Sequence, residues 1–303
     1  MTIEEIARIS QTSKSTVSRV LNNLKGVKEE KRKKILKIIE DYGYKPNIVA
    51  KALSKKRTMH IGFILDDITN LFYRDILYGI ESVLNPSGYN VIISNVYAEP
   101  LKRRKIMEEF SSGIVDGFIV MESDINEDEF LLNLSKRDVP FILIEDYIEN
   151  SSIISILMDN VNIGFIATKH LIDLGHRRIA HITGNFNFKI SRDRLAGYQK
   201  ALYENSITLN EKYIIYGDYL FESGYNSAKK LLNLSSPPTA IFAANDIMAY
   251  GVIKYAKEIK VRIPDDLSIV GVDALKLPNE DNIAITSIKQ PTAKLVKKPP
   301  PYY

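Results

Sequence analysis

The sequence of 303 residues contains no cysteine. It can therefore form neither a disulfide framework nor a thiolate metal site. No apolar run approaches the length of a membrane span, and charged residues appear at once at the N-terminus, where a signal peptide would have an apolar stretch. These absences predict a cytoplasmic protein, and no motif indicates a cofactor or a bound metal.

The sequence also lacks the hallmarks of the common enzyme classes. It has no glycine-rich phosphate loop, no cluster of metal-ligating residues and no nucleophile elbow. One of its 4 histidines, His176, lies in the segment LGHRR between an expected helix and an expected strand. We expect it to be a structural hydrogen-bonding residue rather than a general base, and we expect no enzymatic activity.

Positive charge is concentrated at the N-terminus. Residues 1–60 contain 15 Lys and Arg against 6 Asp and Glu, a net charge of +9, whereas the rest of the chain contains 26 against 31, a net charge of −5. A basic head on a mildly acidic body is typical of a DNA-binding module joined to a sensing or assembly domain. The alternative is a solvated basic tail, but the periodic apolar pattern of the head argues against disorder.

The stretch Thr2–Asn23 predicts two short helices around a tight turn. Thr2 and Glu5 have the spacing of a capping box, and Ser13 can cap the second helix. Two helices at this spacing form a helix-turn-helix, whose second helix enters the major groove of DNA. Gln11 stands where such turns usually have glycine, at a cost of about 1 kcal/mol. The alternative is a plain helical hairpin.

The expected second helix carries candidate base-reading side chains. Lys14, Ser15, Ser18 and Arg19 lie at or near its exposed face. Arginine and lysine can donate to guanine or phosphate, and serine can read either edge of a base. The alternative is a solvated polar face without a partner.

A third helix and a short basic segment follow. The pattern predicts a helix over Lys28–Tyr42, closed by Gly43. Its expected apolar face consists of Ile35, Ile38, Ile39 and Tyr42. A shorter helical run is expected at Asn47–Leu53, where Leu53 lies among lysines and suits a wedge between base steps in the minor groove. The alternative is a linker helix whose leucine packs on a neighbouring domain.

From His60 onward, short apolar strands alternate with helices. We expect strands at residues 60–65, 89–94, 117–121, 140–145, 155–159, 178–183, 213–218, 240–244, 267–273 and 286–290. This alternation predicts parallel sheets covered on both faces. The strands are too many for one compact sheet, so we expect two α/β lobes, with the order restarting at SILMD (155–159). Ligands bind at the carboxyl ends of such strands, here in the cleft between the lobes.

Eight segments along the chain carry a resemblance to a known family. They are TVSRVLN (16–22), YGYKPNIVAKAL (42–53), SSGIVDGFIV (111–120), ATKHLIDLGHRRIAHITG (167–184), SRDRLAGYQKAL (191–202), FAANDIMAYGVI (242–253), IPDDLSIVGVD (263–273) and ITSIKQP (285–291). In this order they resemble segments of the LacI/GalR family of bacterial transcription regulators. The similarity runs from Thr2 to about Thr292.

The resemblance implies a fold of two kinds of domain. It implies an all-α helix-turn-helix head with a hinge helix, and a periplasmic-binding-protein-like α/β core of two doubly wound parallel-sheet lobes. The expected divisions are a head at 1–45, a hinge helix and linker at 46–58, a first lobe at 59–157, a second lobe at 158–288, and a return crossover with an atypical tail at 289–303.

The resemblance also implies a function. The chain is expected to be a sequence-specific transcription regulator, a repressor, that binds a pseudo-palindromic operator in double-stranded DNA as a homodimer. A small-molecule effector in the interlobe cleft is expected to modulate DNA affinity, with a sugar or sugar phosphate first and a purine or nucleoside next. The alternative is a two-lobe solute-binding protein, which would need a signal peptide and no DNA-reading head.

Site residues follow from the resemblance residue by residue. The candidate DNA contacts are Thr2, Ser13, Lys14, Ser15, Thr16, Ser18, Arg19, Asn22, Asn47, Ala50, Leu53 and Ser54. The candidate effector contacts are Asp66, Phe72, Arg194, Tyr219, Asn245, Asp273 and Gln290. Arg194 could fork onto a hydroxyl pair or an anion, or close the cleft in a salt bridge with Asp273.

The sequence departs from the family in three places. After TSIKQPT the family continues for some tens of residues, whereas this sequence gives AKLVKKPPPYY. We expect the helix after Gln290 to be cut short and the first lobe to lack covering apolar surface. Ala274 replaces the usual second aspartate, and the loop Asn70–Tyr73 is altered. Both are expected to touch the cleft, so no relative's effector can be assigned to this chain.

Overall fold

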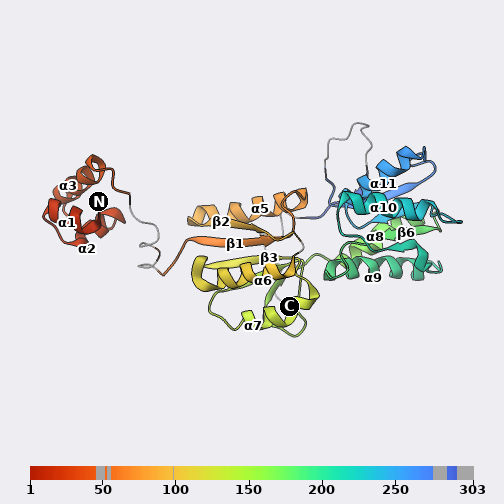
Figure 1. Cartoon of the computed structure of the whole chain (residues 1–303), viewed down its shortest axis with the longest axis horizontal. Coiled ribbons are helices and arrows are strands. Elements are labelled where there is room, and N and C mark those ends of the chain that lie inside the picture. The colour runs from red at the N-terminus through yellow and green to blue at the C-terminus, as the bar shows by residue number, and fades with distance from the viewer. Residues whose placement is uncertain (46–51, 53–55, 98, 276–284, 292–303) are drawn as a thin grey trace. The chain divides into compact units, whose positions relative to one another are not determined.

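A computed structural model describes residues 1–45, 52, 56–97, 99–275 and 285–291. The chain divides into two compact units, Met1–Thr58 and Met59–Tyr303 (Figure 1). The expected hinge contacts Asn47, Ala50, Leu53 and Ser54, and the tail at 292–303, lie outside the described residues. No helix in the described part of the chain is long and apolar enough to cross a membrane.

The N-terminal unit is a bundle of three helices, α1 (Ile3–Ser10), α2 (Lys14–Leu21) and α3 (Glu29–Asp41). Each helix contributes two residues to a small buried cluster, which consists of Ile6, Ala7, Val17, Val20, Ile35 and Ile38. A helix of 8 residues is marginal on its own, so packing on this cluster must stabilise α1 and α2.

The turn between α1 and α2 forms as predicted. Gln11 adopts the left-handed conformation at φ 55° and ψ 43°, and its backbone N–H donates to the carbonyls of Ala7 and Arg8. The prediction for α3 was wrong at Tyr42, which is 60% exposed and does not join the apolar face. The helix ends one residue earlier, Gly43 takes φ 60°, and Tyr44 packs on the cluster instead.

The first sheet of the C-terminal unit has five parallel strands in the order β2-β1-β3-β4-β5. They are β1 (His60–Leu65), β2 (Asn90–Asn95), β3 (Gly117–Met121), β4 (Phe141–Ile144) and β5 (Ile154–Ile156). The intervening helices are α5 (Leu71–Leu84), α6 (Pro100–Glu109) and α7 (Asp128–Leu134), with α5 above the sheet and α6 and α7 below it in Figure 1. Strand β3 is central and completely buried, as its run GFIVM predicts.

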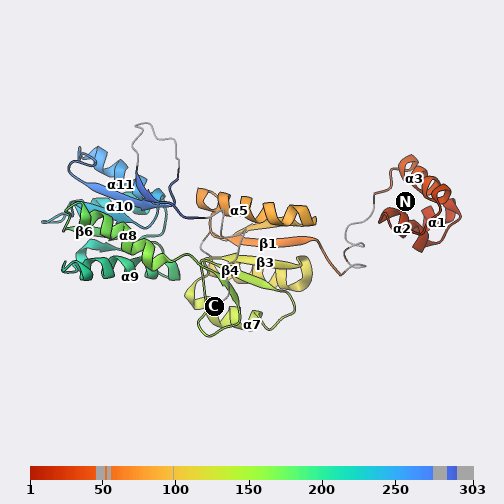
Figure 2. The same ribbon diagram turned by 180° about the vertical axis from the view of Figure 1, so that it is seen from behind.

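The second sheet has the order β10-β9-β8-β6-β7, again parallel. Its strands are β6 (Ile179–Ile182), β7 (Ile214–Ile215), β8 (Ala240–Ala243), β9 (Ser268–Val272) and β10 (Thr286–Ile288). The helices are α8 (Asn160–Asp173), α9 (Lys189–Glu204), α10 (Phe221–Leu232) and α11 (Asp246–Glu258). The pairs α8–α9 and α10–α11 cover opposite faces (Figure 2).

We expected the segment SILMD (155–159) to begin the second sheet, but the structure places its start in the first sheet. Its first two residues, Ser155 and Ile156, belong to β5 (Ile154–Ile156), the edge of the first sheet, which pairs with β4 through Ile142 and Ile154. The helix α8 then begins at Asn160, where Asp159 accepts a hydrogen bond from the backbone N–H of Asn162 as the N-cap. Alternation alone could not assign this strand, because an edge strand and the first strand of a new sheet have the same apolar pattern.

An apolar groove of about 280 Å³ lies at the first sheet. Its walls include Ile61, Ile80, Val83, Ile119 and Phe141.

A basic helical head and a buried polar cavity as candidate functional sites

The first candidate site is the polar face of α2 in the N-terminal unit. Lys14, Ser15 and Arg19 are exposed there, whereas Thr16, Ser18 and Asn22 are half-buried. The inner residues Val17 and Val20 anchor the helix in the cluster. Because the apolar contacts are all on one side, the exposed side chains are available to a partner.

Three of the predicted contact residues have structural duties as well. Ser13 caps α2, because its Oγ accepts from the backbone N–H of Thr16 at 3.2 Å. Thr2 completes the capping box of α1 with Glu5, with distances of 3.2 and 2.8 Å between donor and acceptor. Asn22 donates through Nδ2 to the carbonyl of Ser18 at 2.9 Å and closes α2. Substitutions at these positions would therefore alter helix ends as well as any contact.

An ion pair that sequence reasoning missed joins α1 to α2. The Nζ of Lys14 lies 2.5 Å from Glu4 Oε1, and both side chains are more than half exposed. The hydrogen bond from Lys14 is the main cause that lowers the pKa of the Glu4 carboxyl. One sign of this ion pair was present in the sequence, because Glu4 is an acidic residue in the expected first helix, close to the second.

The second candidate site is a cavity of about 100 Å³ in the C-terminal unit. All seven predicted effector contacts line it: Asp66, Phe72, Arg194, Tyr219, Asn245, Asp273 and Gln290. The other lining residues are Asp67, Thr69, Asn70, Tyr73, Glu122, Phe188, Ile190, Asp218, Leu220 and Ile247. Segments far apart in sequence, from both sheets, thus meet at one cavity.

The sheets determine where these side chains lie. Asp66 and Glu122 directly follow β1 and β3, and Asp273 directly follows β9. Asn245 caps α11 just after β8, where its side chain accepts from the backbone N–H of Met248 at 2.9 Å. The carboxyl ends of parallel strands therefore carry the polar lining, as the position of ligand sites in such sheets predicts.

Arg194 is held in the wall of the cavity by neutral partners. It is 3% exposed, and it donates through Nε to Asn160 Oδ1 at 2.9 Å and through Nη1 to the carbonyl of Ala244 at 2.6 Å. Its position depends on Gly164 in α8, because a Cβ there would overlap the carbonyl oxygen of Arg194. These bonds replace the salt bridge with Asp273 that the sequence left open.

Two carboxyl groups with raised pKa values line the cavity, the buried Glu122 and the half-buried Asp273. Glu122 accepts a hydrogen bond from the Tyr73 hydroxyl at 2.7 Å, and Asp273 accepts one from Gln290 Nε2 at 2.5 Å. Burial is the largest cause of their shifts, and it raises the pKa of Glu122 to about 7 and that of Asp273 to about 8. Both groups can therefore change charge near neutral pH.

Sequence reasoning missed Glu122, and it named Tyr73 only as part of the loop Asn70–Tyr73. Glu122 comes directly after the strand run GFIVM, so the rule for carboxyl ends of strands could have found it. The prediction for Ala274 was wrong, because Ala274 is not among the lining residues. Its backbone N–H donates to Ser287 Oγ at 2.9 Å, while Asp273 provides the side chain at the wall. The loop Asn70–Tyr73 does contribute, through Asn70, Phe72 and Tyr73.

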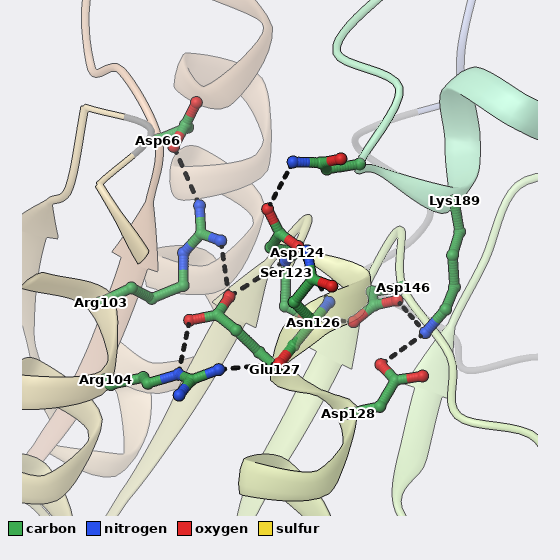
Figure 3. A network of polar contacts seen from close by, with 11 residues as sticks. Asp66, Arg103, Arg104, Ser123, Asp124, Asn126, Glu127, Asp128, Asp146 and Lys189 are labelled. Carbon is green, nitrogen blue, oxygen red and sulfur yellow. Dashed lines mark hydrogen bonds and ion pairs between the residues drawn. The ribbon is translucent and has the colours of Figure 1, made fainter. Parts of the chain in front are cut away.

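A network of charged groups lies beside the cavity (Figure 3). Arg103 of α6 donates to Asp66 Oδ1 and Glu127 Oε2, each at 2.9 Å. Lys189, at the start of α9, lies 2.9 Å from Asp128 and 3.0 Å from Asp146. Because α9 covers the second sheet and both aspartates belong to the first lobe, Lys189 links the two lobes directly.

The histidines do not contribute to either candidate site. His176 forms hydrogen bonds of 2.9 Å with Thr239 Oγ1 and Ser268 Oγ, which confirms the predicted structural role. His181 is buried and stacked on Phe242, and burial lowers its pKa to about 3. Within the described ranges, no group of three or more His, Asp or Glu residues is placed to hold a metal ion.

Comparisons with known proteins agree with this division. The sequence profile described as bacterial regulatory proteins, lacI family, matches residues 2–47, and that of the periplasmic binding protein-like domain matches residues 168–298. The chain is 36% identical over 297 residues to the HTH-type transcriptional repressor PurR of Photobacterium profundum, which covers 98% of this chain and 89% of that protein. It is 37% identical over 292 residues to catabolite control protein A of Priestia megaterium, which covers 96% and 88%.

A solved structure extends the likeness to the whole fold. The crystal structure of the lac repressor dimer bound to operator and the anti-inducer ONPF superposes with a TM-score of 0.83. The two chains are 28% identical, and the match covers 98% of this chain and 89% of that one.

Proposed function

The chain belongs to the lacI family of bacterial regulatory proteins, and from this premise we propose how its two sites divide the work of a repressor. It is a DNA-binding transcription regulator with an effector-binding core. In our proposal the Met1–Thr58 unit reads an operator, and the cavity of the Met59–Tyr303 unit binds a small molecule that changes the affinity for DNA. A protein that regulates bacterial genes in this way would work in the cytoplasm.

The polar face of α2 is the proposed base-reading surface. Lys14, Ser15 and Arg19 are exposed on a helix whose opposite side is anchored in the core of the head. Exposed lysine and arginine at such a face can donate to guanine or to phosphates, and phosphate contacts make binding depend steeply on salt. The remaining proposed contacts are Thr2, Ser13, Thr16, Ser18 and Asn22, together with Asn47, Ala50, Leu53 and Ser54 outside the described residues.

The assembly we propose is a homodimer on a pseudo-palindromic operator. The lac repressor structure is that of a dimer bound to operator. Two heads on a two-fold axis would contact two half-sites, and a Leu53 wedge from each chain would bend the centre of the site. Replacement of Leu53 with Ala should then weaken specific binding far more than non-specific binding.

The single observation that carries the proposed regulator function is the three-helix head with its exposed basic α2 face. A two-lobe solute-binding protein, the alternative, has no use for such a unit. The cavity supports the sensing half of the proposal, because polar and apolar side chains from both lobes line it together. Its position beside the interlobe contacts of Lys189 would let a ligand bias the arrangement of the lobes.

Selection of bound fragments from a random DNA pool by the purified full chain tests this function. At physiological salt we expect enrichment of one palindromic sequence with a flexible central step. Enrichment of a single half-site would mean that the heads act as monomers. Weak, salt-sensitive binding without any enriched sequence would contradict the proposed function.

A further inference from the structure

The cavity has more acidic than basic groups in its lining. Among the lining residues that the structure describes, Arg194 is the one lysine or arginine, whereas five residues carry carboxyl groups. These are Asp66, Asp67, Glu122, Asp218 and Asp273. Arg103 lies 2.9 Å from Asp66 and offsets its charge. The four other carboxyl groups have only Arg194 as a lining cation.

Several hydrogen-bond donors of the lining are already engaged within the protein. Arg194 donates to Asn160 and to the carbonyl of Ala244. The Tyr73 hydroxyl donates to Glu122, and Asn245 Nδ2 donates to the carbonyl of Tyr219 at 3.0 Å. Two of the five N–H donors of Arg194 are used in this way, and the Tyr73 hydroxyl has no donor left for an acceptor on a ligand.

The hydrogen-bond acceptors of the lining, in contrast, have fewer donors bonded to them than they could accept. A carboxylate can accept about four hydrogen bonds, yet the side-chain bond of Glu122 is a single one from Tyr73 and that of Asp273 a single one from Gln290. Gln290 is 4% exposed, and its Oε1 is buried without a hydrogen-bond partner. A buried acceptor without a donor costs about 1–3 kcal/mol of stability. A ligand that brings donors would remove this cost when it binds.

We propose that the effector is a hydroxylated small molecule that bears a protonated amine, such as an amino sugar, and that it carries no phosphate. The inference rests on the function proposed above, because it concerns the effector of the same cavity. An ammonium group has three donors and no acceptor, and its bonds to carboxylates are charge-assisted. A phosphate would bring acceptors and negative charge to a wall that already has an excess of both.

Glu122 is the proposed acceptor of the ammonium group. It is 7% exposed, it lies at the end of the central strand β3, and no cation is bonded to it among the described residues. Burial is the largest cause that raises its pKa to about 7, and the charges of Asp66 and Glu145 add to it, whereas Tyr73 and Arg194 lower it. A bound ammonium would act in the same direction as Arg194 and stabilise the carboxylate.

Matched sugars test the inference directly. The purified full chain is titrated by calorimetry with D-glucose, D-glucosamine and D-glucose 6-phosphate, and with the corresponding galactose and mannose series. We expect one amine to bind about tenfold or more tighter than its parent sugar, the value of one charge-assisted contact, and the phosphates to give no heat. Tighter binding of a phosphate than of its amine, or no binding by any amine, would overturn the proposal.

Two variants separate a specific contact from a general effect of charge. Glu122→Gln keeps an acceptor for Tyr73 but removes the negative charge, and it should bring the amine and the parent sugar to within about threefold of each other. Glu108→Gln removes an exposed charge on α6 and should leave the preference unchanged. An undiminished amine preference in Glu122→Gln would contradict the assignment of this residue.

The same preparations report on the regulator function separately. If they bind one selected DNA sequence but prefer sugar phosphates, the inference about the effector fails and the proposed function stands. If they bind no DNA sequence selectively, the proposed function fails whatever sugar they bind.

Discussion

The two candidate sites use polar side chains under opposite conditions. On α2 the side chains of Lys14, Ser15 and Arg19 are exposed, and the ion pair of Lys14 with Glu4 is open to solvent. In the cavity, Arg194 and Glu122 are buried and Asp273 is half-buried, and each is bonded to a partner within the protein. Exposed ion pairs contribute little to stability, whereas a buried polar group that loses its partner is costly.

In the function that we propose, this contrast separates the reading of DNA from the sensing of the effector. Side chains in solvent can change partners at low cost, which suits a surface that must exchange water and ions for many different DNA sequences before it meets the right one. Side chains in a buried network have one arrangement, so a ligand that completes the network can shift a conformational equilibrium. Substitutions of the exposed residues Lys14, Ser15 and Arg19 should therefore affect binding with little effect on stability, and substitutions in the cavity should affect both.

The largest expected effect is the loss of a buried cation. Replacement of Arg194 with Leu would leave Asn160 Oδ1 and the carbonyl of Ala244 without their donors, which we expect to lower the free energy of unfolding of the C-terminal unit by about 3–5 kcal/mol. Arg192→Leu is the matched control, because Arg192 lies two residues away and its bond to the carbonyl of Phe186 is exposed. Chemical denaturation measures the free energy of unfolding of both variants. Similar decreases in the two would contradict the distinction between buried and exposed sites.

The next effect is a pH dependence located at Glu122. Its pKa is raised from 4.5 to about 7, so the folded state binds more protons than the unfolded state between these values. Stability from this group is thus fully present below pH 4.5 and is lost as the pH rises through 7. Between pH 5 and 8 the wild type should lose on the order of 2–3 kcal/mol relative to Glu122→Gln. Parallel stability curves for the two proteins would contradict the assignment.

The smallest effect should be that of Glu4 in the head. Glu4→Gln frees Lys14 and removes a negative charge beside α2, so we expect DNA to bind about two- to fivefold more tightly at low salt, with the gain vanishing at high salt. Thermal unfolding should be unchanged within error. A loss of affinity would show instead that Glu4 helps to position Lys14 for DNA.

Local rules recovered most of the fold from sequence. The caps at Thr2 and Ser13 and nearly every strand follow from short-range pattern, because those choices depend on neighbouring residues. Tyr42 was assigned to the apolar face by periodicity, although α3 ends before it. The edge strand β5 was assigned to the wrong sheet, because strand pairing is a property of the tertiary structure.

The cavity was predicted only in part for the same reason. The positions of Asp66, Asn245 and Asp273 follow from the ends of strands, which the sequence shows. Their partners do not, since Glu122 bonds to a tyrosine 49 residues away and Arg194 bonds to a carbonyl 50 residues away. Such long-range contacts decide which hydrogen-bond donors are engaged and which acceptors have no partner. For this reason the chemical class of the effector could not be derived from the sequence.

The central claim is that the face of α2 reads DNA sequence. Its most direct test compares the affinity of the full chain for the selected duplex and for a scrambled duplex, using fluorescence anisotropy, in Arg19→Ala and in Lys34→Ala. Lys34 is an exposed residue of α3 and serves as the control for charge. We predict that Arg19→Ala lowers the ratio of the two affinities by about tenfold, as expected for loss of one base contact, and that Lys34→Ala leaves the ratio unchanged. Equal losses on both duplexes in Arg19→Ala would contradict the account.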